Sequence, residues 1–345
     1  MNEKIIYSII FVGVIILGII LFLIFKRKKL SMSADIGPTK PIYTPGPSSI
    51  TTNISSPYVD TTSWPPFDLV NCFKECGQKY FTLAFIVSQG NIPSWGGYYP
   101  LSTTNPSWYL DQIDNLRALG GDVIISCGGA SGQELAQTIT DINSLVVAYQ
   151  SIIDIYKLQI LDFDIEGSAI ADQISIDLRN KALVILRKNN PNLKIHYTLP
   201  VMPDGLDSNG MNLVKNAFSN GLKIEVVNLM CMDYNSENID MGQAAISAAQ
   251  NTHSQLINIG YSNTKVGICP MIGINDTNQL FTLADAQKVV DFSKSNSYIG
   301  LLAFWSSNRD IEQKTQGTSA RADQSGVIQS KNQFAMIFNQ FTGSG

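Results

Sequence analysis

The sequence predicts an α/β protein whose parallel strands close into a (β/α)8 barrel, the TIM-barrel fold, and three observations favour this fold. Short runs that are apolar on both faces alternate with helix-length stretches from about residue 57 onward. Polar residues gather where these runs end, as they do at the active face of barrels. The 345 residues, of which 44% are apolar, suffice for one large domain. A doubly wound open sheet is the alternative.

Eight strands and several helices are expected along this barrel. The expected strands are residues 81–87, 122–127, 158–164, 193–199, 225–232, 265–269 and 299–305, with a short eighth strand near 95–99. The expected helices include residues 171–188, 241–259 and 283–295. Polar groups follow six of these runs, and we expect one cleft at the carboxyl ends of the strands to receive them.

The start of the chain has a different composition from the rest. Residues 5–25 carry no charge and are long enough to span a bilayer. The basic run 26–29 (KRKK) follows directly, with no small-residue cleavage site, which disfavours a cleaved signal peptide. We therefore expect a single-pass membrane anchor over 1–30, with the lipid bilayer as the partner of residues 5–25. Its basic flank places the C-terminal domain on the cytosolic side.

The remaining chain divides into a linker and a catalytic domain. Residues 31–55 are rich in Ser, Thr, Pro and Gly, which predicts a linker, and the barrel is expected over 56–345. After residue 30 the chain holds 19 basic and 27 acidic residues, a net charge of −8. This acidic balance argues against nucleic-acid binding, which uses a basic face.

The cysteines and histidines indicate neither a metal site nor a disulfide framework. The cysteines are Cys72, Cys76, Cys127, Cys231 and Cys269. Three of them lie in apolar strand-like runs, and two are four residues apart on an expected helix, a poor geometry for a disulfide. The two histidines are far apart and have no companion ligands. We expect no metal and no cofactor.

The segment 162–166 (DFDIE) carries the chemistry that the sequence shows most clearly. In a strand, Asp162, Asp164 and Glu166 lie on one face, while Phe163 and Ile165 lie on the other. Such an acidic row is costly, since neighbouring like charges and burial both resist ionisation. We therefore interpret the row as functional.

Other catalytic motifs are absent from the sequence. The glycine-rich run 128–132 lacks the Gly-Lys-Ser/Thr ending of a phosphate loop, and it fits neither GxGxxG nor the GxSxG nucleophile elbow. Carboxylate chemistry remains, and paired carboxylates serve glycoside hydrolysis or metal binding. No motif that would grip a phosphate accompanies them.

Several segments together resemble the family 18 glycoside hydrolases, the chitinases and endo-β-N-acetylglucosaminidases, from about residue 57 to the end. DFDIEG resembles the end of the family's DxxDxDxE signature, and 126–129 (SCGG) its SxGG motif on the third strand. The family's first, sixth and eighth strands are matched by 80–86 (YFTLAFI), 227–234 (VNLMCMDY) and 303–310 (AFWSSNRD). Residues 95–97 (WGG) and 270–276 (PMIGIND) are similar to a microbial chitinase branch.

The resemblance implies retaining, substrate-assisted hydrolysis next to N-acetylglucosamine. Glu166 would be the general acid, and Asp164 would hold the N-acetyl group whose oxygen attacks the anomeric carbon, which gives an oxazolinium ion. Asp162 would share a proton with Asp164. Trp305 would form a flat floor beneath the sugar, and Ser126 would support the acidic row by a hydrogen bond.

Two departures from the family pattern affect the expected site. Gln159 replaces the first Asp of the signature, so that any proton relay from the acidic row ends there. Met232 occupies the usual Tyr position, and we expect the hydroxyl of Tyr234, two residues on and on the same strand face, to replace it. Asp233 keeps its matching place as a contact to the sugar.

Several alternatives remain open at this stage. Trp95 and Trp108 are either further sugar platforms or packing residues. The substrate is chitin or chito-oligosaccharide, and an N-glycan core or peptidoglycan is the alternative. A lectin-like barrel that binds glycan without cutting is a third possibility, which the presence of Glu166 disfavours.

Overall fold

The computed structural model describes residues 50, 53–101, 108–236 and 238–343, all within one unit that spans 43–345. Among these residues, no helix is long and apolar enough to cross a membrane. The expected span 5–25, its basic flank and the linker up to residue 49 lie outside the described residues.

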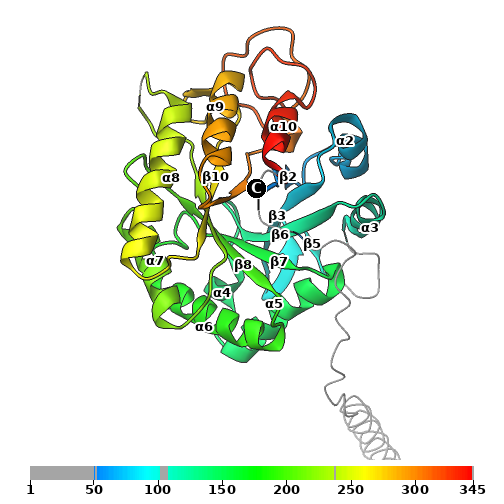
Figure 1. Ribbon diagram of the computed structural model, residues 1–345. Helices are drawn as coiled ribbons and strands as arrows, with labels where there is room; N and C mark the ends of the chain where they lie inside the picture. Colours follow the sequence, from blue (N-terminus) through cyan, green and yellow to red (C-terminus); the bar gives the residue numbers. More distant parts are fainter. Residues whose placement is uncertain (1–49, 51–52, 102–107, 237, 344–345) are drawn as a thin grey trace, which may run out of the picture. The chain divides into compact units, whose positions relative to one another are not determined.

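Eight parallel strand segments form a closed barrel at the centre of the molecule (Figure 1). In chain order they are β1 and β2 together (Ile54–Ser55 and Tyr58–Asp60), β3 (Tyr80–Gln89), β6 (Asp122–Gly128), β7 (Ile160–Asp164), β8 (Lys194–Pro200), β9 (Val226–Met230), β10 (Lys265–Cys269) and β13 (Ile299–Leu302). The barrel closes because β1 pairs with β13 while β2, three residues later, pairs with β3. The (β/α)8 prediction is therefore confirmed.

The first barrel strand is the element that the sequence prediction missed. Residues 54–60 form it, so the barrel begins two residues before the expected boundary at 56, and residues 54–55 are strand and not linker. The segment 95–99, expected as the eighth strand, instead belongs to a hairpin of β4 (Ile92–Trp95) and β5 (Tyr99–Pro100) that pairs antiparallel with the end of β3. Residues 80–86 consequently lie on the second strand, not the first.

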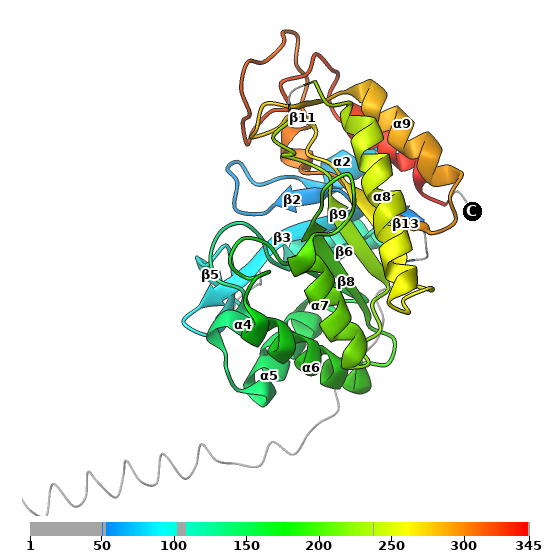
Figure 2. The same cartoon turned by 90° about the vertical axis from the view of Figure 1, so that its left-hand side faces the viewer.

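Helices cover the outside of the barrel (Figures 1 and 2). They are α2 (Leu69–Cys76), α3 (Leu110–Ala118), α4 (Leu135–Thr138), α5 (Ile142–Tyr156), α6 (Gln173–Asn189), α7 (Ser208–Ser219), α8 (Met241–Asn258), α9 (Leu283–Lys294) and α10 (Gln333–Phe338). The three helices expected by range, α6, α8 and α9, agree within two residues at each end. Asp side chains accept hydrogen bonds from first-turn amides at five of these N-termini, as helix caps do.

Side chains alternate between the inside and outside of the barrel along β7. Phe163 points outward and packs between the rings of Tyr149 and Tyr197, with centroids 5.1 and 5.8 Å away. Ile160 points inward into an apolar plug formed with Ile54, Tyr80, Ile124, Val226 and Leu301. Asp162 and Asp164 follow Ile160 on the inner face, toward the carboxyl end of the strand. The plug therefore closes the barrel below the carboxylates.

Candidate active site

A cavity of about 250 Å³ opens at the carboxyl ends of the barrel strands. Its walls combine carboxylates, aromatic rings and thioethers. It is lined by Tyr58, Phe85, Ala130, Asp164, Glu166, Thr198, Met230, Met232, Asp233, Cys269, Met271, Asp276 and Trp305. Five of the expected site residues therefore meet in one place, namely Asp164, Glu166, Met232, Asp233 and Trp305.

Asp162 lies beneath this cavity and is held by three hydroxyl groups. Ser126 Oγ and Tyr58 Oη donate to its Oδ2 at 2.7 and 2.9 Å, and Thr198 Oγ1 donates to its Oδ1 at 2.9 Å. Burial raises the pKa of Asp162 to about 6, while these hydrogen bonds limit the rise because they favour the ionised form. Ser126 thus supports the acidic row as expected, but it acts from below and does not line the cavity.

Asp164 and Glu166 form a coupled pair of carboxyl groups. Burial, followed by the charges of Glu166 and Asp162, raises the pKa of Asp164 well above its usual value. Burial also raises the pKa of Glu166, and the charge of Asp233 adds to that rise. The charge of Asp162 thus acts on Asp164 as well. The expected sharing of a proton between Asp162 and Asp164 stays a prediction.

The glycine pair after β6 fixes the backbone that carries these carboxylates. Gly129 N donates to the carbonyl oxygen of Asp164 at 2.9 Å. Gly128 has a φ of +108°, and a Cβ at this position would come within 2.0 Å of the same carbonyl oxygen. A larger residue would therefore push β6 and β7 apart. On the other side of β7, Ile165 N donates to Thr198 O at 3.0 Å.

Aromatic rings form one wall of the cavity. Trp305 stacks on Phe85 with ring centroids 5.7 Å apart and an interplanar angle of 11°. Trp305 remains partly exposed and lines the cavity, and its role as a sugar floor stays a prediction.

Asp233 is held in place on the wall that follows β9. Its Oδ1 accepts from Thr277 N at 3.1 Å, and its own amide donates to Asn275 Oδ1 at 3.1 Å. These contacts join the loops after β9 and β10. The Asp233 carboxylate is therefore fixed near Glu166 and is not free to swing away.

The structure places Tyr234 outside the set of residues that line the cavity, and its expected bond to the N-acetyl group stays a prediction. Its side chain is only 4% exposed, packs in the hydrophobic core, and does not line the cavity. Burial, followed by the neighbouring Cys231, raises the pKa of its hydroxyl well above the usual value. The physical reason is that β9 ends at Met230 and Asp233 adopts a positive φ of 54°, so the two-residue alternation of a strand no longer applies.

Tyr58 is the functional residue that sequence reasoning missed. Its hydroxyl lies 2.9 Å from Asp162 Oδ2 and 2.8 Å from Thr198 Oγ1, and the residue lines the cavity. The only sequence pattern that indicated this strand is the short alternating segment 58–60, and the Ser- and Pro-rich residues around it obscured that pattern. The hydroxyl network beneath the carboxylates therefore comes partly from the unexpected first strand.

Three other residues considered from sequence have structural positions. Trp95 is fully buried, and its indole N–H donates to Tyr156 Oη at 2.7 Å, so it is a packing residue. Trp108 is partly buried and stacks on Tyr99. Gln159 Nε2 donates to Asp122 Oδ2 at 3.1 Å, and Gln159 is not among the partners of Asp162.

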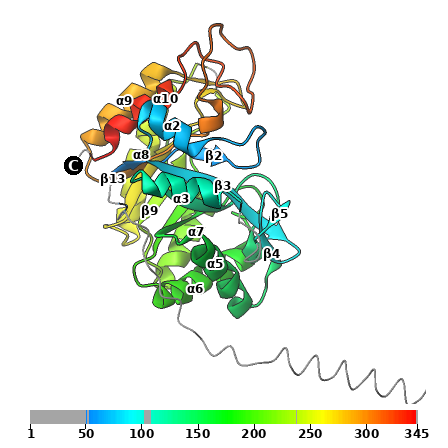
Figure 3. The ribbon, with the colours of Figure 1, turned by 90° about the vertical axis from the view of Figure 1, so that its right-hand side faces the viewer.

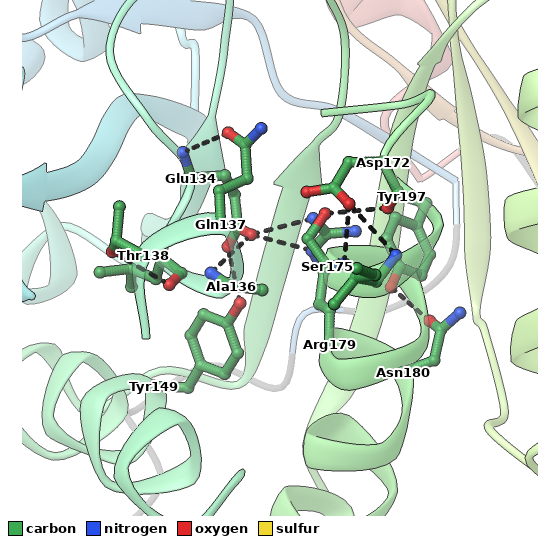
Figure 4. Close-up of polar contacts among 12 residues, drawn as sticks. Glu134, Ala136, Gln137, Thr138, Tyr149, Asp172, Ser175, Arg179, Asn180 and Tyr197 are labelled. Atoms are coloured by element: carbon green, nitrogen blue, oxygen red, sulfur yellow. Dashed lines mark hydrogen bonds and ion pairs between the residues drawn. The ribbon is translucent and has the colours of Figure 1, made fainter. Parts of the chain in front are cut away.

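A second polar cluster lies on the outer side of β7 (Figure 4). Arg179 of α6 donates from Nε and Nη2 to Glu134 Oε2 at 3.1 and 2.9 Å, and both side chains are buried. Tyr149 Oη donates to Glu134 Oε1 at 2.6 Å. This outer cluster joins the loop after β6 to the helix after β7 and thus brackets the segment that carries Glu166.

Within the described ranges, no group of three or more His, Cys, Asp or Glu side chains is arranged to hold a metal ion.

Comparisons with known proteins agree with this geometry. The chain is 36% identical over 317 residues to a probable bifunctional chitinase/lysozyme of Escherichia coli, covering 84% of this chain and 34% of that protein. It is 36% identical over 280 residues to endochitinase 11 of Metarhizium anisopliae, covering 75% of this chain and 53% of that protein. The chain thus spans between a third and about half of these relatives. No model of a protein family matches it.

A solved structure covers the chain more completely. The catalytic domain of the hyperthermophilic chitinase from Pyrococcus furiosus superposes with a TM-score of 0.78 and 34% identity, over 87% of this chain and 98% of that domain. The chain belongs to the family 18 glycoside hydrolases. A family 18 chitinase from Pseudoalteromonas aurantia, 17% identical with a TM-score of 0.53, shares the fold. The present chain therefore carries the barrel of that family.

Proposed function

We propose that this family 18 member hydrolyses β-1,4-linked N-acetylglucosamine polymers, chitin or chito-oligosaccharides, with retention and through an oxazolinium intermediate. The observation that carries the proposal is the coupled pair of Asp164 and Glu166 at the cavity, both with raised pKa values. The relatives from Escherichia coli, Metarhizium anisopliae and Pyrococcus furiosus are named chitinases, and catalytic-site mutants of an active domain of a Pyrococcus furiosus chitinase have been crystallised with chito-oligosaccharides.

Glu166 acts as the general acid in this mechanism. Its carboxyl group is partly buried at the cavity wall, where burial raises its pKa and so favours the protonated form that a general acid needs. It donates this proton to the glycosidic oxygen as the bond to the anomeric carbon breaks. After the leaving sugar departs, the Glu166 carboxylate takes a proton from a water molecule that attacks the anomeric carbon. The bond between the anomeric carbon and the acetamido oxygen breaks in this step, so the acetamido group is restored and Glu166 is again the acid.

Asp164 positions the group that attacks. The acetamido oxygen of the substrate attacks the anomeric carbon, and a ring closes to the oxazolinium ion. Asp164, which lies next to Glu166 and lines the cavity, accepts the acetamido N–H and stabilises the positive charge. No protein nucleophile is required. Trp305 supports the sugar by its exposed indole face, and Asp233 contacts its hydroxyls.

A Glu166→Gln variant tests the proposal. Because general acid catalysis contributes roughly 10²–10⁴-fold, we expect turnover of chitotetraose to fall by about 10³-fold with little change in binding. Turnover equal to that of the unaltered chain would overturn the mechanism. An Asp276→Asn variant, which changes another carboxylate at the cavity outside the acidic row, is the matched comparison and should lose far less.

We further propose that residues 1–30 anchor the barrel to a membrane as a single-pass segment, with the barrel on the cytosolic side. The support is the uncharged run 5–25 and the basic run that follows it. Protease cleavage within 31–49 in intact, oriented vesicles would test the orientation. Cleavage from the lumenal side alone would contradict it.

A further inference from the structure

Charged side chains are distributed unevenly between the two ends of the barrel. Figures 2 and 3 show the loop after β2 and the β4–β5 hairpin projecting from the carboxyl end, where the catalytic cavity opens. The loops that follow the strands at that end carry exposed carboxylates, among them Asp204, Asp207, Asp240 and Asp276. The opposite, amino end consists of the last helical turns and the loops that lead into the next strand, and its exposed charges are mostly basic.

Five exposed lysines lie at the amino end, each on a different segment. Each of them precedes a strand or ends the helix before it, so the set is distributed around the barrel. We call this set the basic face. It consists of Lys79 before β3, Lys157 before β7, Lys188 in the last turn of α6, Lys223 before β9 and Lys294 at the end of α9.

Acidic side chains at the amino end are fewer, and one of them is already paired. Glu225 lies 2.8 Å from Arg187 and 3.0 Å from Lys223, a trio whose net charge is positive. Asp154 and Asp291, in the last turns of α5 and α9, are exposed carboxylates at this end. The basic face therefore keeps a positive charge, although the chain after residue 30 is acidic overall.

Helix electrostatics explain only part of the basic face. A helix C-terminus favours a nearby cation, and this effect accounts for Lys188 and Lys294. Lys79 and Lys223 lie in loops beyond the helix caps at Gly77 and Asn220, and the effect falls off within the last turn. Their presence at the same end thus points to a use of the surface as a whole.

The chain enters the barrel at this same end. Ile50, the first described residue, is 2% exposed and belongs to the apolar plug. Its N–H donates to Gln159 Oε1 at 3.4 Å, and its carbonyl oxygen accepts from Lys194 Nζ at 2.7 Å. Gln159 directly precedes β7 and Lys194 begins β8, so Ile50 is fixed at the amino end. In the sequence, only residues 30–49 separate it from the basic run 26–29.

The basic face fits an anionic lipid surface. Lysines spread over several segments attract a surface of diffuse negative charge without a defined docking geometry, as polybasic segments do at the cytoplasmic leaflet. The proposed anchor would bring such a leaflet close to the point where the chain enters the barrel. Tethering raises the local concentration of the two partners, so that even a weak attraction becomes effective.

We infer that the basic face docks on an anionic lipid surface, so that the catalytic cavity at the opposite end faces the aqueous phase. This inference rests on the proposed anchor for the choice of partner and is independent of the proposed hydrolysis. It adds an orientation to the proposed function. A cavity that faces away from the bilayer takes a polymer from solution and not a glycan attached to the same membrane.

The experiment uses the full chain, reconstituted into phosphatidylcholine vesicles with or without phosphatidylserine. A membrane-impermeant, amine-reactive reagent labels the accessible lysines, and mass spectrometry quantifies each site. We expect phosphatidylserine to lower the labelling of the basic face roughly fivefold, and high salt to restore it by screening. Lys314, 83% exposed in the loop after β13, should be labelled equally in both vesicles.

Charge reversal separates the basic face from other contacts with lipid. Lys157→Glu/Lys188→Glu should abolish the protection of the three remaining lysines of the basic face, whereas Lys157→Arg/Lys188→Arg should retain it. Lys314→Glu, at the other end of the barrel, is the matched control and should also retain it. Equal labelling of the basic face with and without phosphatidylserine overturns the inference, as does equal protection of Lys314.

Flotation of the same samples tests the anchor separately. A chain that floats with neutral vesicles but gains no protection from phosphatidylserine sustains the anchor and overturns the docking. A chain that floats only with phosphatidylserine, with its basic face protected, sustains the docking and overturns the anchor. Protection of these lysines by duplex DNA and not by phosphatidylserine would identify a nucleic acid as the partner and overturn the inference.

Discussion

Strand β7 separates two carboxylate clusters that differ in how their charge is compensated. On the inner face, Asp162, Asp164 and Glu166 have hydroxyl and carboxyl partners but, among the residues described, no ion pair with Lys or Arg. On the outer face, Glu134 is paired with the buried guanidinium of Arg179. Both clusters are largely buried, yet only the outer one contains a cation. Charge compensation, and not burial, distinguishes the two.

The outer cluster behaves as a fixed ion pair. Burial by itself would lower the pKa of Arg179, but the charge of Glu134 outweighs it and raises that pKa above its usual value. Arg179 therefore keeps its proton near neutral pH. The inner cluster shows the opposite, since burial raises the pKa values of its carboxyls toward neutrality. The Glu134–Arg179 ion pair on the outer face of β7 thus lies directly behind the titratable carboxyl groups on the inner face.

The largest expected effect comes from breaking the outer pair. Arg179→Met leaves the Glu134 carboxylate buried without its cation, which should lower the free energy of unfolding by about 3–5 kcal/mol. Chemical denaturation at pH 7 measures the loss. Glu134→Gln/Arg179→Met, which removes both charges, should recover most of it. If the double variant were as unstable as the single one, packing and not the ion pair would explain the loss.

The next effect separates activity from stability. Asp164→Asn is nearly isosteric and removes a carboxyl group whose charge burial disfavours in the free protein, so the free energy of unfolding should change little. Turnover of chitotetraose should nevertheless fall by about 10³-fold, because the amide carries no charge to stabilise the oxazolinium ion. Chemical denaturation measures the change in stability, and rate measurements on chitotetraose measure the change in turnover. A variant that lost stability while keeping turnover would reverse the roles assigned to the two faces of β7.

The inner face could be predicted from sequence because one simple rule governs it. Asp162 and Asp164 stay on the inner face since β7 keeps its two-residue alternation through Asp164. The same rule failed for Tyr234, because β9 had already ended and the chain turned at Asp233. Alternation is thus informative only within an intact strand, and its end depends on turn conformations that one sequence does not reveal.

The outer cluster and the first strand lay beyond sequence reasoning for a different reason. Glu134 and Arg179 are 45 residues apart, and neither belongs to a motif, so no local sequence pattern predicts their contact. Residues 54–60 form a strand because β13 and β3 supply its hydrogen-bond partners on either side. A Ser- and Pro-containing segment has weak intrinsic strand preference, and its structure comes from tertiary pairing.

The smallest effect concerns the pH dependence of stability. Burial raises the folded-state pKa of Asp162 to about 6, from about 3.8 in the unfolded chain. The folded protein therefore holds the Asp162 proton more tightly, so this group favours folding below about pH 4 and loses that contribution as pH rises through about 6. The two pKa values differ by about 2, which corresponds to about 3 kcal/mol.

Asp162→Asn removes this titrating group from both the folded and the unfolded chain. Because the amide does not titrate, the fall in unfolding free energy between pH 4 and pH 7 should be about 3 kcal/mol smaller than in the unaltered chain. Glu134→Gln, on the other face of β7, serves as the matched variant, and it should leave the Asp162 contribution to the slope in place. Denaturation at several pH values measures both slopes. Equal slopes for Asp162→Asn and the unaltered chain would show that Asp162 ionises as readily in the folded state as in the unfolded state, and that the three hydroxyl donors fully offset its burial.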